Sequence, residues 1–333
     1  MKLAILHSRY TESHDKSGRG YQDDAIAYVQ SNIDRTFALL RRAGEGGADL
    51  AVTNEDFGAM GGYLRDMEHP DCFGAVVSAL EKSVLEGLCG IAKEFGMIIA
   101  ANEYETDGGG IYNTTKLIGR DGGAIGRYRK VHLPSGERFR VQPGRSHPVF
   151  KTDVGNIGFA VCYDMLFPEH CRILALNGAD MIIHQSQGWF PGGPNKNVLG
   201  EPFLRVRAAE NRVYMVVSKN IQDDGGMSCV VDNRGDVLAS QGGGENVLFT
   251  DIEPDYDLLD ENDYDNYFAG LKSLRARHLL HREPSTYGRL LDAAPDFTSE
   301  ALSAERMCTY DEWVELIKKL GAMTENDLNK MHW

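Results

Sequence analysis

The sequence has little cysteine, no concentrated basic charge and no long apolar run. Only six of the 333 residues are cysteines, and no two of them form a CxxC pair or a spacing typical of zinc sites. We therefore expect reduced, mostly buried thiols, which are typical of the cytoplasm. No apolar stretch reaches the length that spans a bilayer, and the first residues offer no segment long enough for a signal peptide. These absences predict a soluble cytoplasmic protein that does not enter a membrane.

The charge balance is acidic, which disfavours partners that carry phosphate. Forty-nine acidic residues face 35 lysines and arginines, so the formal net charge is −14. Such a surface repels nucleic acid and anionic membranes, and we expect neither as a partner. Hydrophobic residues make up 42% of the chain, enough for a large buried core. No linker rich in proline or serine divides the chain before residue 290.

Apolar periodicity predicts helices that alternate with strands. Apolar residues at three- and four-residue spacing predict helices over 23–43, 76–95, 168–177 and 197–212. Short apolar runs predict strands over 2–7, 48–53, 97–101, 156–162, 181–185 and 213–218. The turn at 120–123 predicts a hairpin between 111–119 and 122–128. This order indicates an α/β or α+β sheet that helices cover.

Three of these strands end in chemically reactive side chains, namely Glu55, Lys130 and Cys162. Catalytic groups favour such ends, where rigid elements meet loops. Taken singly, each residue has a more ordinary explanation, because strand-end charges are usually solvated and a strand-end cysteine is usually a small buried hydrophobe. Spacing alone therefore leaves a catalytic role open.

These three segments, in this order, resemble the nitrilase superfamily of carbon–nitrogen hydrolases, whose members use a Glu–Lys–Cys triad. Further stretches fit the same pattern over 112–114, 177–180, 207–211 and 226–235. The resemblance covers roughly residues 1–290, which we expect to form one hydrolase domain, with a helical extension over 291–333. It implies an α+β fold built as a four-layer αββα sandwich.

The resemblance also implies a mechanism. Cys162 would attack the carbonyl carbon, and Glu55 would move the protons. Lys130 and the backbone N–H of Tyr163 would stabilise the oxyanion, and Glu137 would orient Lys130 or the substrate. We expect the charge of Lys130 to lower the pKa of the thiol. This chemistry needs no metal or other cofactor, and the sequence displays no metal-ligand cluster.

Substrate contacts are harder to place from the sequence. We expect them from Tyr163, Asn113, Gln185 and Trp189, of which the last two belong to the stretch 184–190. That stretch follows a strand beside the one that ends at Cys162, and it either lines the substrate site or packs as an ordinary loop. His132 beside the lysine is more often a structural or surface group than a catalytic one.

The residues around the nucleophile favour one branch of the family. Tyr163-Asp164 after Cys162 is similar to amidases and carbamoyl-amide hydrolases, whereas true nitrilases usually have Trp-Glu. Omega-amidase-like members have an arginine where this chain has Leu166, which disfavours a dicarboxylate amide. We therefore expect hydrolysis of a small linear amide or N-carbamoyl compound with release of ammonia. A nitrilase is the enzymatic alternative, and a binding or scaffold protein that kept the fold is the non-enzymatic one.

The end of the chain bears on assembly. Residues 310–320 carry an apolar stripe that includes Trp313, Leu316, Ile317 and Leu320. The stripe could cover its own subunit. Because family members commonly assemble, we expect a homodimer or a higher homo-oligomer in which this segment docks across a subunit contact.

Overall fold

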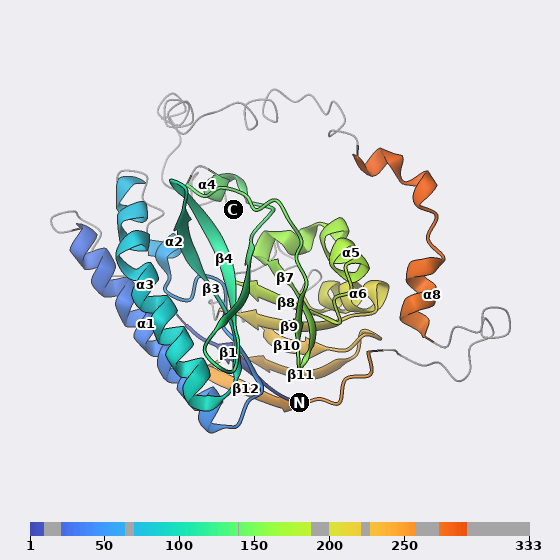
Figure 1. Ribbon diagram of the computed structural model, residues 1–333, viewed down its shortest axis with the longest axis horizontal. Helices are drawn as coiled ribbons and strands as arrows, with labels where there is room; N and C mark the ends of the chain where they lie inside the picture. The colour runs from blue at the N-terminus through green and yellow to red at the C-terminus, as the bar shows by residue number, and fades with distance from the viewer. Residues whose placement is uncertain are drawn as a thin grey trace.

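A computed structural model describes residues 1–9, 21–63, 70–138, 140–187, 200–220, 227–256 and 273–291. Two six-stranded mixed sheets form its centre (Figure 1). The first sheet has the order β12-β1-β2-β3-β4-β5, with β1 (Lys2–His7), β2 (Leu50–Val52), β3 (Ile98–Asp107), β4 (Gly110–Ile118), β5 (Ala124–Arg129) and β12 (Asn246–Asp251). The second has the order β11-β10-β9-β8-β7-β6, with β6 (Phe150–Thr152), β7 (Gly155–Val161), β8 (Met181–Ser186), β9 (Tyr214–Lys219), β10 (Met227–Val231) and β11 (Val237–Gly242).

Helices cover the outer face of each sheet, which gives four layers. The long helices α1 (Tyr21–Glu45) and α3 (Pro70–Phe95) pack on the first sheet, and α5 (Pro168–Leu176) and α6 (Glu201–Asn211) pack on the second (Figure 1). Short helical segments complete the described chain, namely α2 (Met60–Tyr63), α4 (Ser135–Arg138), η1 (Cys162–Leu166), α8 (Leu274–Leu280), η3 (Pro284–Thr286) and η4 (Gly288–Leu291). The expected αββα sandwich is confirmed.

Strand alternation explains why three apolar layers form. In β1, Ala4 and Leu6 join the core under α1 and α3, while Leu3 and Ile5 join the core between the two sheets. Successive side chains of a strand point to opposite faces, so a strand covered on both sides must be apolar throughout. This requirement produces the continuous apolar runs of the sequence.

Most expected elements lie where periodicity puts them, with differences at their ends. The helix expected from residue 76 begins at Pro70, and the strand expected over 97–101 continues to Asp107. The extra strand residues pair with β4 in a hairpin whose turn holds Gly108 and Gly109 at positive φ. The pairing partner, rather than the local pattern, therefore sets the length of β3.

The expected C-terminal extension over 291–333 lies outside the described residues except for Leu291. Before it, the described segment 273–291 contains α8, and its Arg275 forms a 2.6 Å ion pair with Asp180 at the end of the α5 layer. Within the described ranges, none of the helices combines the length and the apolar character that crossing a membrane requires.

Candidate active site

The fold brings Glu55, Lys130 and Cys162 together from different strands. Glu55 follows β2 and Lys130 follows β5, both in the first sheet, whereas Cys162 follows β7 of the second sheet. Lys130 Nζ donates a 2.9 Å hydrogen bond to Glu55 Oε1. The charges of both residues act on the Cys162 thiol. The facing sheets thus bring together three groups that are 75 and 32 residues apart in the chain.

A second carboxylate completes the surroundings of the lysine. Lys130 Nζ also donates to Glu137 Oε2 at 2.7 Å, and its side chain is only 2% exposed. Glu137 lies on α4, immediately after the segment that carries Lys130. Burial alone would lower the pKa of Lys130, but the charges of Glu137 and Glu55 outweigh it and hold that pKa well above its ordinary value. The lysine is therefore a permanent cation held between two carboxylates.

Asn113 on β4 fixes the two carboxylates relative to each other. Its amide nitrogen donates to Glu55 Oε1 at 3.0 Å and to Glu137 Oε1 at 2.8 Å. Its amide oxygen accepts a 2.9 Å hydrogen bond from Asn102. All polar atoms of this 1% exposed side chain are thus occupied within the protein.

The other oxygen of Glu55 is held from the second sheet. The backbone N–H of Gln187, one residue beyond β8, donates to Glu55 Oε2 at 2.9 Å. The Gln187 side-chain amide also donates to Asp56. Gln187 therefore contacts both Glu55 and Asp56, which are neighbours in the chain. Glu55 Oε1 thus accepts from Lys130 and Asn113, and Oε2 accepts from the second sheet.

Cys162 occupies a strained turn and carries a protonated thiol. Its φ is +47°, in the left-handed region that non-glycine residues rarely adopt. Burial and the charge of Glu55 raise the pKa of the thiol to about 12, although Lys130 and a hydrogen bond with Ser186 oppose them. Lys130 does lower this pKa, as expected, but burial and two carboxylates outweigh one lysine, so the net pKa of the thiol is raised.

Asp164 ties the segment of Lys130 to the turn of Cys162. It is fully buried and accepts hydrogen bonds from the Tyr128 hydroxyl at 2.6 Å and from the Val161 backbone at 2.9 Å. The backbone N–H and the ring Nδ1 of His132 donate to its Oδ1 at 2.8 and 2.9 Å. Tyr128 and His132 flank Lys130 in the chain, and Val161 precedes Cys162. The carboxylate thus joins the strand ends that carry Lys130 and Cys162.

The residues expected to contact the substrate differ in their burial and in whether their polar groups are already bonded within the protein. Gln185 is fully buried and joins the two sheets, donating to Thr53 O at 2.8 Å and accepting from Thr115 Oγ1 at 2.6 Å. Like Asn113, it has its amide engaged by the protein rather than available to a ligand. Tyr163 is half-buried on η1. Trp189 lies outside the described residues.

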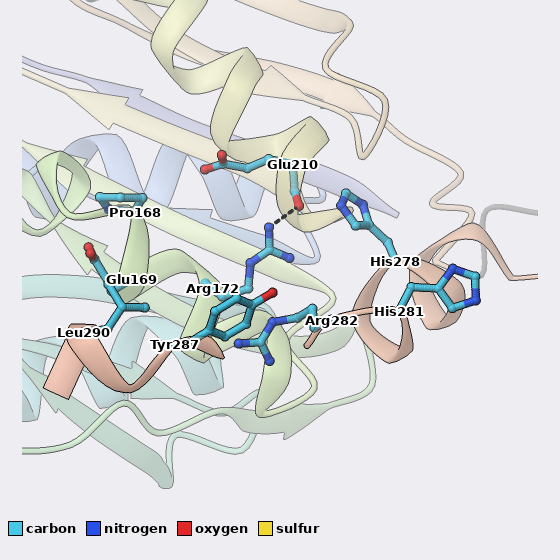
Figure 2. Close-up of a pocket in the computed structure, with 9 residues that line it drawn as sticks. All are labelled: Pro168, Glu169, Arg172, Glu210, His278, His281, Arg282, Tyr287 and Leu290. Carbon is cyan, nitrogen blue, oxygen red and sulfur yellow. Dashed lines mark hydrogen bonds between the residues drawn. The ribbon is translucent and has the colours of Figure 1, made fainter. Parts of the chain in front are cut away.

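A cavity of about 460 Å³ lies away from the triad, between the α5–α6 layer and the segment 273–291. Arg172 of α5 reaches the backbone oxygen of Glu210 at its edge, and Arg282 lies over the ring of Tyr287 opposite (Figure 2). Neither Glu55, Lys130 nor Cys162 lines it. Its volume therefore gives no information on the substrate of the triad.

Sequence comparisons identify the family of the chain. Residues 25–256 match the family model described as Carbon-nitrogen hydrolase. A protein named Nitrilase from Pyrococcus abyssi is 32% identical over 215 residues, which cover 62% of this chain and 78% of that protein. The omega-amidase NIT2 of Mus musculus is 30% identical over 238 residues, which cover 67% of this chain and 83% of that protein.

Solved structures share the fold. A carbon–nitrogen hydrolase from Helicobacter pylori G27 superposes with a TM-score of 0.70 at 22% identity, covering 88% of this chain and 98% of that one. An amidase from Nesterenkonia sp. AN1, captured after Michael addition of acrylamide at its active site cysteine, superposes with a TM-score of 0.66 at 22% identity, covering 87% and 99%. The family match spans more than half of the chain and includes all three strand-end residues. The chain belongs to the carbon–nitrogen hydrolase family.

Proposed function

We propose that the protein hydrolyses the C–N bond of a small linear amide or N-carbamoyl compound and releases ammonia through a thioester on Cys162. One observation carries the proposal. A buried lysine is held at 2.9 and 2.7 Å between the carboxylates of Glu55 and Glu137, and the charges of all three act on one strand-end thiol. Buried charges are costly unless they are paired, so this arrangement is typical of a functional site.

In the first half of the proposed reaction, Cys162 attacks the carbonyl carbon while its proton passes to Glu55. The proton then moves from Glu55 to the leaving nitrogen, the C–N bond breaks and ammonia departs. We assign this transfer to Glu55 Oε2, the oxygen that is held from the second sheet, which also carries Cys162. Lys130 and the backbone N–H of Tyr163 stabilise the oxyanion of the tetrahedral intermediate.

In the second half, water attacks the thioester. Glu55 takes a proton from the water, the C–S bond breaks, and Glu55 passes the proton to the sulfur. The carboxylic acid leaves as product, and the Glu55 carboxylate and the Cys162 thiol are regenerated. From an N-carbamoyl compound the same steps release ammonia and a carbamic acid, which then decomposes into carbon dioxide and the amine. Glu137 keeps Lys130 in place and charged throughout.

The raised thiol pKa fits a base-assisted attack. A thiol with a pKa of about 12 is almost entirely protonated at neutral pH, so it needs a partner that removes the proton as the bond to carbon forms. Glu55 is held in the site by Asn113, Lys130 and Gln187. The resting enzyme is thereby protected from alkylation and oxidation, which act on thiolates.

The substrate class follows from the branch of the family. Relatives named omega-amidase and nitrilase both match the chain. Tyr163-Asp164 after the nucleophile favours the amidase side, and Leu166 in place of arginine disfavours a dicarboxylate amide. A nitrile is the second candidate substrate, since attack of the same thiol on a nitrile carbon also leads to a thioester.

The test is a screen of ammonia release over linear amides, ureido acids and nitriles. We expect turnover of at least one amide or ureido compound. Turnover of nitriles alone would establish the nitrilase alternative. If no compound is turned over and Cys162 reacts like an ordinary free thiol, the scaffold alternative is favoured.

A further inference from the structure

A second group of titratable side chains lies beside the catalytic turn and takes no chemical part in the proposed reaction. It consists of His132, Asp164 and His170, here called the His–Asp–His cluster, whose ligand atoms all lie within 4.8 Å of one another. Asp164 Oδ1 is 2.9 Å from His132 Nδ1 and 3.8 Å from His170 Nδ1. Sequence spacing gave no sign of this cluster, because its members are 32 and 6 residues apart on different elements.

The protonation of His170 leaves a lone pair facing the carboxylate. His170 Nε2 lies 2.8 Å from the Phe159 carbonyl oxygen, which can only accept, so Nε2 carries the ring proton. Nδ1 then points a lone pair toward Asp164 and has no hydrogen-bond partner among the described residues. A proton or a metal cation between these two atoms would give the buried Nδ1 the partner that it lacks.

The charges and donor types suit a metal cation. Asp164 accepts hydrogen bonds at both carboxylate oxygens, as an ionised group does, and His170 Nδ1 is an acceptor atom because Nε2 carries the ring proton. Two imidazole nitrogens and a carboxylate oxygen are ligands that zinc and its neighbours accept. The bound ion would replace the proton that His132 Nδ1 donates to Asp164, and that proton would leave to solvent.

The ligand atoms lie near the separations of a metal site. Zinc binds nitrogen and oxygen ligands at about 2.0–2.1 Å, so the ligand atoms of a tetrahedral site are about 3.3 Å apart. The two distances to Asp164 Oδ1 bracket this value, and the third separation, between the ring nitrogens of His132 and His170, lies within 4.8 Å. The His132 side chain is 26% exposed and gives the ion a route from solvent.

His147 adds a further polar atom next to the cluster. Its ring centroid is 4.7 Å from that of His170, and its Nε2 is buried without a hydrogen-bond partner among the described residues. A nitrogen in this position is available to hydrogen-bond a water molecule that an ion in the cluster would carry.

We propose that the His–Asp–His cluster binds one divalent transition-metal ion of the zinc type through His132 Nδ1, Asp164 Oδ1 and His170 Nδ1. The ion takes no part in the hydrolysis. It draws Asp164 Oδ1 away from the His132 backbone, and that contact helps to hold the ends that carry Lys130 and Cys162. Binding therefore inhibits the enzyme reversibly, a consequence that rests on the proposed function, whereas the binding itself does not.

The binding test uses Cys162→Ala protein, which removes the competing thiol, and titrates it with Zn²⁺ by calorimetry and with Co²⁺ by visible absorption. We expect one ion per chain. In His170→Gln the new amide can still donate a hydrogen bond to the Phe159 carbonyl, but the ligand atom Nδ1 is lost. His132→Gln removes the other imidazole ligand. Each should weaken binding by about tenfold or more. His278→Gln, at an exposed histidine on α8, is the matched control and should bind as tightly as the parent.

Absence of saturable Zn²⁺ binding in the Cys162→Ala protein would overturn the proposal. The partner between His170 Nδ1 and Asp164 would then be a proton. Unchanged affinity in His132→Gln, whose partly exposed ring makes it the safer variant for folding, would also overturn it. With Cys162 present, His170→Gln should raise the Zn²⁺ concentration for half-inhibition by the same factor by which it weakens binding. If His170→Gln weakens Zn²⁺ binding but leaves the concentration for half-inhibition unchanged, the cluster binds the ion but does not inhibit the enzyme through it.

Discussion

The charge of Glu55 affects Cys162 in two opposite ways, and Glu55→Gln separates them. The carboxylate accepts the thiol proton in the proposed reaction, yet its charge also raises the pKa of the resting thiol, while Lys130 lowers it. Glutamine removes the negative charge and leaves the lysine cation in place. We therefore predict that Glu55→Gln makes the thiol more acidic at the same time as it abolishes turnover.

The size of the effect follows from the surroundings of the thiol. With a pKa of about 12, the thiolate fraction at pH 7.5 is about 3 × 10⁻⁵, against about 0.1 for a free thiol of ordinary pKa. Removal of a neighbouring carboxylate lowers such a pKa by about one to three units, which raises the thiolate fraction at fixed pH about 10- to 1,000-fold. A less basic thiolate is also less nucleophilic, so the net gain in alkylation rate is about 3- to 30-fold.

The assay is the pH dependence of alkylation at Cys162 by 2-iodoethanol, read by mass spectrometry of the peptide that contains it. This reagent is neutral and has no amide, so it does not resemble the proposed substrate. The control is Glu169→Gln, which removes an exposed carboxylate from α5 and should leave the rate unchanged. A wild-type thiol that titrates near the ordinary value, or a Glu55→Gln thiol that reacts no faster than wild type, would refute the reasoning.

Three further predictions concern residues around the triad and the end of the chain. Asn113→Ala should lower kcat by about tenfold or more with little change in KM, because two hydrogen bonds to carboxylates are lost; unchanged kcat in steady-state assays would remove its positioning role. Glu137→Gln should lower turnover less than Glu55→Gln, whose loss should lie in the range of about 10²–10⁴-fold, and an equal loss in the same assay would assign Glu137 a direct part. Deletion of residues 303–333 should lower the oligomeric mass measured by light scattering, and an unchanged mass with an unchanged Tm would show that this segment neither joins subunits nor stabilises one.

The layers of the fold could be predicted because local patterns determine them. A strand covered on both faces has to be apolar, and the runs that end at Val52 and Val161 satisfy this condition. The extension of β3 to Asp107 could not be predicted, because its alternating charged residues are stabilised by pairing with β4 and by ion pairs. Pairing of this kind depends on the partner strand and not on the segment itself.

The site could be predicted only as far as its residues follow a recognisable order. Glu55, Lys130 and Cys162 were located from their segments, and the structure brings them together. The engaged amide of Asn113 and the sign of the thiol pKa depend on burial and on which atoms meet across the sheets, which no spacing reveals. The Tyr163-Asp164 pair pointed to a branch of the family and gave no hint that Asp164 joins two strand ends.

The central claim is that turnover passes through a bond to the sulfur of Cys162. It is tested most directly by ammonia release from Cys162→Ala and Cys162→Ser beside the wild type, on the amide or ureido compound that the screen identifies. We predict that both variants fold, with circular dichroism spectra like that of the wild type, and that neither releases ammonia above the uncatalysed rate. Substantial ammonia release by folded Cys162→Ala protein would contradict the covalent mechanism.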